Sequence, residues 1–169
     1  MEIRQAKTED FDSIWLILYE IFQEGATYSF PPDTTKEEGF KIWMETPAAT
    51  YVAISDGKIA GTYFIKKNQP GLGAHVCNAG YAVSALFRGH GIGKAMCEHS
   101  ILEARRLGFK AMQYNLVVST NTIAVNLWQD CGFQIIGTLP MAFNHMEKGL
   151  VDAYVMYQLL ENNRPGTER

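Results

Sequence analysis

The stretch Tyr81–Ala95, YAVSALFRGHGIGKA, decides the fold, because a strand pattern runs here through three alternate glycines into a helical pattern. Without Cβ atoms, Gly89, Gly91 and Gly93 let the backbone adopt positive φ and approach a ligand closely. Their N–H groups, with the partial positive charge at the start of the following helix, can bind a pyrophosphate. A strand-to-helix turn that binds no ligand is the alternative interpretation.

Two familiar phosphate motifs fit this turn poorly. A Rossmann fingerprint needs G-x-G-x-x-G and an acidic residue at the end of the next strand, whereas that strand ends here in Val117-Val118-Ser119. A P-loop needs Gly-Lys-Ser/Thr, but Ala95 follows Gly93-Lys94. The turn therefore belongs to neither class.

Outward from the turn, hydrophobic periodicity and turn residues predict the remaining elements. Strands are expected at residues 2–6, 51–54, 58–65, 75–83, 111–118, 133–139 and 151–160. Helices are expected after Thr8, after a Thr34-x-x-Glu37 capping box, at 91–107 and after Asn121. This order predicts an α/β (α+β) domain with a single mixed, mostly antiparallel sheet and helices on both faces. We expect one domain over residues 1–160 and a polar tail over 161–169.

Composition excludes several classes of protein. Of 169 residues, 47% are apolar and 20% are charged, which is ordinary globular usage and excludes a disordered chain, a collagen-like repeat or a coiled coil. No apolar run approaches the ~20 residues of a membrane span, and the charged N-terminus does not resemble a signal peptide. A net charge of -3 without any Lys/Arg cluster beyond a pair argues against nucleic acid as a partner. Three cysteines and four histidines without metal-ligand spacing predict a cytoplasmic protein with reduced thiols and no metal.

The arrangement Arg88-x-x-Gly91-x-Gly93 resembles the acyl-CoA signature of the GNAT family of N-acetyltransferases. Asn121–Phe133, NTIAVNLWQDCGF, resembles the family's next motif, at the separation that the family uses. The resemblance implies a GNAT-like acyl-CoA N-acyltransferase fold and acetyl-CoA as cosubstrate. It implies cofactor contacts by Tyr81, Ala82 and Val83 with the pantetheine arm, by Arg88, Gly89, His90, Gly91, Ile92, Gly93 and Lys94 with the pyrophosphate, and by Asn121 and Asn126 on the next helix.

Two asparagines in otherwise apolar strands are candidates for the acceptor site. Asparagine has a low strand propensity, so Asn78 and Asn115 need a reason to be there. Their surroundings resemble the GNAT branch that acetylates small amino acids and proline analogues, which implies that both asparagines contact the acceptor and take part in catalysis. Two amides can donate N–H bonds to a carboxylate without a buried cation. The alternative is that hydrogen bonds to neighbouring backbone groups satisfy the two side-chain amides, without any role in function.

Three further residues are candidates for acceptor binding. Tyr28 and Phe30 lie in the loop that forms one side of the acceptor site in this family, although such aromatics can equally be packing lids. His75 lies in the same expected strand as Asn78, and satisfaction by neighbouring backbone alone is at least as good an interpretation. His145 and Glu147, before the last strand, are candidates for a mobile lid, but a solvated loop is the favoured interpretation.

The expected proton chemistry departs from the family pattern at Trp128, where many relatives carry a tyrosine that protonates the leaving thiolate. An indole N–H is only a hydrogen-bond donor near neutral pH. We expect Trp128 first to pack in the core and second to form a wall of the acyl pocket. Direct transfer needs no covalent intermediate, so Cys77 is interpreted as a small buried apolar residue.

The sequence thus predicts an acetyl-CoA-dependent N-acetyltransferase that transfers acetyl directly to a small, amino-acid-like amine in a ternary complex. Acetylation of a protein N-terminus or lysine is one alternative, and a non-catalytic acyl-CoA sensor is the other. The family's habits also predict a homodimer.

Overall fold

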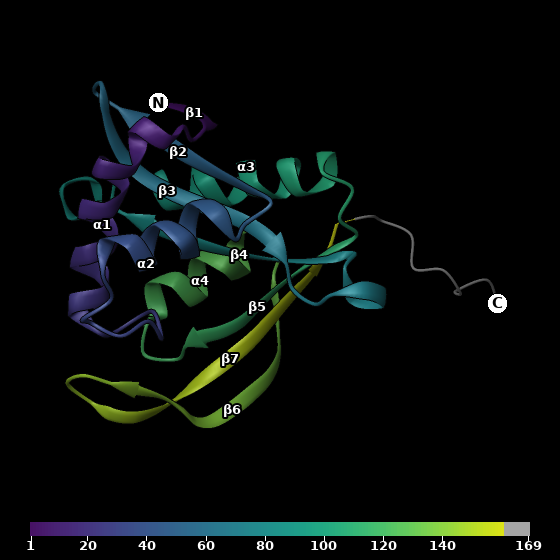
Figure 1. Ribbon diagram of the computed structural model, residues 1–169. Coiled ribbons are helices and arrows are strands. Elements are labelled where there is room, and N and C mark those ends of the chain that lie inside the picture. Colours follow the sequence, from purple (N-terminus) through teal and green to yellow (C-terminus); the bar gives the residue numbers. More distant parts are fainter. Residues whose placement is uncertain (161–169) are drawn as a thin grey trace.

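A seven-stranded sheet organises the computed structural model, which describes residues 1–160 (Figure 1). Its strands are β1 (Glu2–Gln5), β2 (Ala49–Ser55), β3 (Lys58–Lys67), β4 (Val76–Val83), β5 (Ala111–Val118), β6 (Gln134–His145) and β7 (Gly149–Leu159). They lie in the order β1-β2-β3-β4-β5-β7-β6, and all neighbouring pairs are antiparallel except the parallel pair β4–β5. The mixed, mostly antiparallel sheet is therefore confirmed. The polar tail expected over 161–169 lies outside the described residues.

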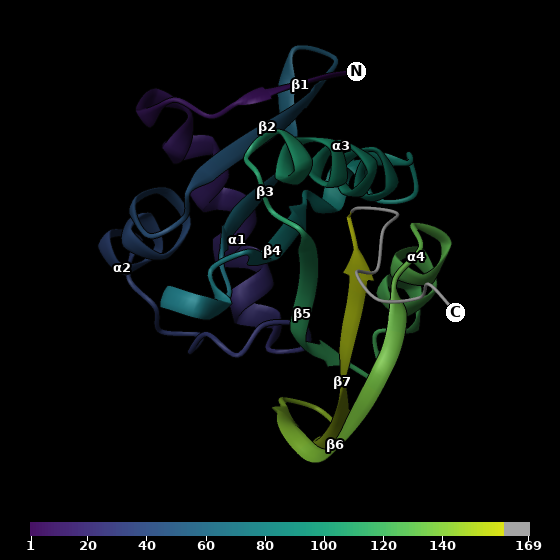
Figure 2. The same cartoon turned by 90° about the vertical axis from the view of Figure 1, so that its right-hand side faces the viewer.

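Helices cover both faces of this sheet, as Figure 2 shows in side view. On one face lie α1 (Phe11–Glu24) and α2 (Lys36–Phe40), which continues as a π-helical turn over Lys41–Glu45. On the other face lie α3 (Ile92–Arg106) and α4 (Thr122–Asp130). Short 3-10 turns occupy Thr8–Asp10, Gly71–Gly73 and Ala85–Phe87. The order of helices and strands agrees with the sequence prediction.

The sheet separates two apolar cores because strand side chains alternate between its faces. Under α1, the buried Ile14, Leu18 and Phe22 pack with Val52 and Phe64 of the sheet. On the opposite face, α3 and α4 bury a second cluster against the strands, which includes Tyr63, Cys77, Met96, Met112, Val125 and Phe133. The two cores hold the edges of β4 and β5 rigidly in place between the helices.

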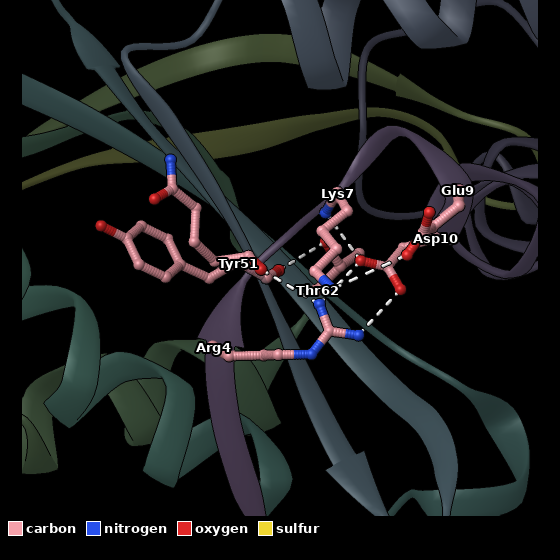
Figure 3. Close-up of polar contacts among 7 residues, drawn as sticks. Arg4, Lys7, Glu9, Asp10, Tyr51 and Thr62 are labelled. Atoms are coloured by element: carbon pink, nitrogen blue, oxygen red, sulfur yellow. Dashed lines mark hydrogen bonds and ion pairs between the residues drawn. The ribbon is translucent and has the colours of Figure 1, made fainter.

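An ion pair fastens the first strand to the start of α1 (Figure 3). Both guanidinium nitrogens of Arg4 donate to the Asp10 carboxylate, at 2.8 and 2.9 Å, and the Lys7 backbone N–H donates to the same carboxylate at 2.7 Å. The hydrogen bond from Arg4 is the largest cause that lowers the pKa of Asp10 below its usual value. Ionised Asp10 therefore stabilises the fold through this link.

Two local predictions about helix starts are corrected. Thr35 rather than Thr34 caps α2, accepting from the Glu38 N–H at 3.2 Å while the Glu38 carboxylate accepts from the Thr35 N–H. The Thr34 hydroxyl instead donates to the Pro31 carbonyl in the preceding turn. Thr8 begins a 3-10 turn, and α1 starts only at Phe11.

The hairpin of β6 and β7 is longer than the sequence pattern predicts. Pro140 and Met141, with φ of +51° at Met141, interrupt the alternation of β6, so the sequence pattern predicts an end at Leu139. The pairing resumes at Phe143–Val151 and continues to His145–Gly149. The interpretation of His145 as solvated is wrong, because its side chain is buried and its Nδ1 accepts from the Glu147 N–H at 3.1 Å.

Candidate active site

A cavity of about 730 Å³ opens where β4 and β5 separate. These two strands pair only at Val76–Ala111 and Cys77–Met112, at the start of both. Beyond that point β4 stays paired with β3, and β5 stays paired with β7 through an irregularity between Tyr114 and Val117. The backbone groups on the facing edges of the two strands therefore have no strand partner here and can bind a ligand. The volume of the cavity lies in the range of small-molecule sites.

The glycine turn forms one end of the cavity. Gly89 and Gly91 have φ of +79° and +76°, which only glycine adopts readily, and a Cβ on either would meet no atom within 4 Å. Gly91 is the N-cap of the fifteen-residue α3, so the first N–H groups of that helix face this open space. Gly93 has a different role, since its Cβ would lie 3.1 Å from Leu127 Cδ2 and its smallness brings α3 close to α4. The cradle fits a phosphate group.

Charged side chains surround this cradle. Arg88 and Lys94 line the cavity, and Arg88 Nη2 lies 3.0 Å from the Glu24 carboxylate at the end of α1. Within residues 1–160, Glu24 is the only acidic residue in the cavity lining. The cradle is therefore basic apart from one carboxylate that is already paired.

Tyr28 closes the open edge of β4 beside the cradle. Its hydroxyl accepts from the Tyr81 N–H at 2.6 Å and donates to the Tyr81 carbonyl at 2.8 Å. Gly80 makes room for this contact, because a Cβ there would lie 3.0 Å from the Tyr28 hydroxyl oxygen. Burial raises the pKa of the Tyr28 phenol, so it stays neutral near pH 7. Tyr28 thus occupies the backbone groups that the GNAT resemblance assigns to the pantetheine arm.

Three aromatic residues form the floor between β4 and β5. The Trp128 ring lies 4.7 Å from that of Tyr81 and 5.2 Å from that of Tyr114, measured between centroids. The Tyr81 and Tyr114 hydroxyls are 2.8 Å apart, and Tyr81 also contacts the Ser100 hydroxyl at 2.6 Å. Burial raises the pKa of both phenols well above the usual value, so neither is an acid near neutral pH. Trp128 both packs on this floor and lines the cavity.

Amide side chains gather at the other end of the cavity. Asn78 Nδ2 donates to the Gln113 carbonyl at 3.0 Å, which ties β4 to β5 at the point of separation. Asn115 Nδ2 donates to Asn68 Oδ1 at 2.7 Å, and Asn115 Oδ1 accepts from Gln113 Nε2 at 2.9 Å. Each amide nitrogen keeps a second N–H that has no partner among residues 1–160. Asn78 and Asn115 both line the cavity.

Lys66 is a cavity residue that sequence reasoning missed. It is the register partner of Asn78 across β3 and β4, and its Nζ lies 5.4 Å from the centroid of Phe64. In the sequence Lys66 and Lys67 form an ordinary basic pair. Side chains of a strand alternate between the two faces of the sheet, so Lys66 shares the face of the buried Phe64 and Lys67 does not. This alternation was the signal that could have identified Lys66 as the lysine on the cavity face.

The cavity brings together most residues that the sequence singled out. Its lining includes Tyr28, Phe30, Asn78, Tyr81, Ala82, Val83, Arg88, Gly89, Gly91, Ile92, Gly93, Lys94, Asn115 and Asn121. Sequence reasoning missed Glu24, Phe64, Lys66, Leu116, Ile123 and Leu127, which also line it.

Three singled-out residues do not line the cavity: His75, His90 and Asn126. His75 lies in the turn before β4, which begins at Val76, and is exposed. The exposed His90 ring contacts the Arg88 carbonyl at 3.1 Å. Asn126 lies on an exposed face of α4.

A cysteine and possible metal ligands were the other reactive groups to consider near the cavity. Cys77 is fully buried and burial raises its pKa to about 12, which agrees with the interpretation of a packing residue. No group of three His, Cys, Asp or Glu residues within 1–160 is arranged to hold a metal ion. No helix in the same range is long and apolar enough to cross a membrane.

Known proteins resemble the chain in sequence and in structure. The family model described as "Acetyltransferase (GNAT) family" matches residues 15–133. N-acetyltransferase aca1 from Schizosaccharomyces pombe is 34% identical over 158 residues, which cover 83% of this chain and 75% of that protein. A GCN5-related N-acetyltransferase from Kribbella flavida has a TM-score of 0.89 and 42% identity, over 94% of this chain and 96% of its own. A GNAT superfamily phosphinothricin acetyltransferase from Sinorhizobium meliloti, in complex with acetyl-CoA, has a TM-score of 0.84 and 21% identity, over 98% and 93%.

Proposed function

Because the chain belongs to the GNAT family and is an acetyl-CoA-dependent N-acetyltransferase, we propose that its acceptor is a small amine of amino-acid type. The observation that carries the proposal is the pair of amides, Asn78 and Asn115, at the end of the cavity opposite the glycine cradle. Their remaining N–H groups suit a carboxylate. Among residues 1–160, the one carboxylate in the lining, Glu24, is paired with Arg88 at the cradle, so none at the amide end attracts a cationic acceptor.

The proposed transfer is direct and takes place with both substrates bound. The cradle of Gly89 and Gly91 holds the phosphates of the donor, and the separated edges of β4 and β5 position its thioester. The backbone N–H of β4 near Val83, on the edge that faces β5, polarises the acetyl carbonyl. The acceptor end places the amine for attack, and this alignment supplies much of the rate enhancement. The new C–N bond forms as the thioester C–S bond breaks, and CoA leaves as a thiolate that takes a proton from solvent. Cys77 takes no covalent part, since its thiol is buried and protonated.

The proton of the acceptor amine leaves to solvent in this scheme. Within residues 1–160 the cavity lining has no histidine, and its single carboxylate, Glu24, lies beside the cradle. Burial holds the pKa of the Tyr28, Tyr81 and Tyr114 phenols above the usual value, so none is a base near pH 7. The rate should accordingly rise with the fraction of neutral acceptor amine.

Acetylation of a protein N-terminus or of a lysine side chain is the competing acceptor class. In its reacting, neutral form a lysine side chain offers Lys66 no anionic group, and within residues 1–160 no acidic residue at this end of the cavity attracts its ammonium form. Like charges repel most strongly in a partly enclosed site, where water screens them least. The small anionic acceptor is therefore the better match.

The deciding experiment measures thiol release from acetyl-CoA with a panel of acceptors: neutral amino acids, proline analogues, polyamines and short peptides. Amino acids and their analogues should be the best acceptors. Asn78→Ala and Asn115→Ala should each lower kcat/KM for the acceptor by roughly 5- to 150-fold, because a carboxylate oxygen loses a donor worth about 1–3 kcal/mol. The KM for acetyl-CoA should stay nearly unchanged. Activity with polyamines or peptides alone would refute the proposed acceptor.

We propose further that residues 1–160 act as one catalytic domain in a cytoplasmic homodimer. The long β6–β7 hairpin exposes Ile136, Met141 and Leu150, and a second copy would cover these apolar side chains. The three free cysteines suit a reducing compartment. Light scattering should give twice the chain mass, and Ile136→Glu should reduce it. A monomer at micromolar concentration would contradict the dimer.

A further inference from the structure

Lys66 stands apart from the other basic residues of the cavity. It lies near the end of β3, opposite Asn78 of β4, and cross-strand partners project from the same face of a sheet. Phe64, two residues earlier, shares this face and also lines the cavity. The Lys66 Nζ lies 5.4 Å from the Phe64 ring centroid, so the side chain extends along the cavity wall.

Within residues 1–160, the ammonium of Lys66 has no carboxylate partner. The ion pairs formed among residues 1–160 do not include Lys66. Their basic partners are Arg4, Lys7, Lys36, Arg88 and Arg106. The one acidic residue in the lining, Glu24, is paired with Arg88 at the cradle. Lys66 therefore contributes a charge to the acceptor end that nothing in the described chain neutralises.

Lys66 is also far from the phosphate cradle. Asn78, its partner, precedes Val83 by five residues of β4, which is about 16 Å at the rise of a strand. The Debye length at physiological salt is about 8 Å, so an exposed charge acts only weakly over that separation. Arg88 and Lys94 serve the cradle, and Lys66 is left for a different anion.

We propose that Lys66 is a specificity residue that binds the carboxylate of the acceptor and selects anionic acceptors over cationic ones. This inference rests on the proposed function, since it assigns the carboxylate of an amino-acid acceptor to a side chain. The ammonium supplies charge attraction, and the second N–H groups of Asn78 and Asn115 supply directional hydrogen bonds to the same group. Together they leave the acceptor amine pointing along the cavity toward the thioester.

The test compares an amino acid with its own carboxamide, which keeps the amine and the side chain but lacks the negative charge. Lys66→Met should lower kcat/KM for the amino acid at least tenfold and change that for the carboxamide less than threefold. Lys66→Arg should retain most of the preference, and Lys66→Glu should reverse it. Lys67→Met is the matched control, because Lys67 is exposed and outside the lining, and it should change neither acceptor.

The readouts separate this inference from the proposed function. If the parent enzyme acetylates amino acids but Lys66→Met affects both acceptors equally, or neither, the role of Lys66 is refuted and the proposed acceptor stands. If the parent enzyme does not acetylate amino acids, both fail. The KM for acetyl-CoA and the melting temperature should match the parent in Lys66→Met. A selective loss for the amino acid under those conditions supports charge recognition.

Discussion

The contact between Tyr28 and β4 makes a quantitative prediction about stability. Tyr28→Phe removes one hydroxyl and with it two hydrogen bonds, leaving the Tyr81 N–H and carbonyl without their partner. An unsatisfied buried group costs about 1–3 kcal/mol, and water entering the cavity recovers part of the loss. We expect a loss of about 2 kcal/mol, which lowers the melting temperature by about 4–8 °C for a domain of this size.

Thermal and urea unfolding of the ligand-free enzyme measure this loss. Tyr19→Phe is the matched control, because Tyr19 is 48% exposed on α1, the helix that precedes the loop of Tyr28, and its hydroxyl forms no hydrogen bond within residues 1–160. It should stay within about 0.5 kcal/mol of the parent. Equal stability of the two variants would refute the role given to the Tyr28 hydroxyl.

Binding of acetyl-CoA tests whether the pantetheine arm takes the place of the Tyr28 hydroxyl on β4. If the pantetheine arm bonds to the β4 edge, as the family resemblance implies, it replaces Tyr28 at Tyr81 and restores the missing partners. The rise in melting temperature on adding acetyl-CoA should then be larger for Tyr28→Phe than for the parent. A smaller rise would show that the Tyr28 hydroxyl supports the complex rather than competing with it.

Three further predictions concern the cradle, the indole and the N-terminal ion pair. Gly91→Val should abolish the thermal shift caused by acetyl-CoA, whereas Gly57→Val, with a similar φ of +71° in the β2–β3 turn, should keep it; equal shifts would contradict the cradle. Trp128→Phe should keep most activity, and a loss above roughly a hundredfold would instead give the indole a role in proton transfer. Asp10→Asn should lower the free energy of unfolding by about 2 kcal/mol at pH 7. Because Arg4 lowers the pKa of Asp10 in the folded state, the difference in unfolding free energy between this variant and the parent should be complete above about pH 4 and vanish as the pH falls through the folded pKa. A difference that stays constant with pH would contradict this role of ionised Asp10.

The fold was largely predictable because its signals are local. Helical spacing around Ile14 and Leu18, the αL glycines Gly25 and Gly108, and the alternation in the strands each act within a few residues. The errors lie where a local signal is interrupted, as by Pro140 and Met141 in β6, or where neighbours compete for one role, as Thr34 and Thr35 do at the start of α2.

The candidate site was predictable only where a contiguous motif carries it. The cradle lies within one turn, so its glycines can be read directly from the sequence. The contact of Tyr28 with Tyr81 spans 53 residues and uses backbone atoms, which leave no side-chain pattern. Lys66, Asn78 and Asn115 come from three strands, and their proximity depends on sheet register. A basic pair in the sequence does not show which lysine faces a cavity.

Charge illustrates why a whole-chain property can mislead at the site. The chain carries a net charge of -3, which argues against nucleic acid as a partner but gives no information about the cavity. Among the residues that line the cavity, three are basic and one is acidic, a formal charge of +2 within an acidic protein. The basic residues lie at both ends, with aromatic side chains between them. Such a distribution suits one substrate that brings phosphates to the cradle and another that brings a carboxylate to Lys66, with the uncharged thioester and amine meeting over the apolar middle. Higher salt should therefore weaken the binding of both substrates, although the net charge of the chain alone would predict the opposite.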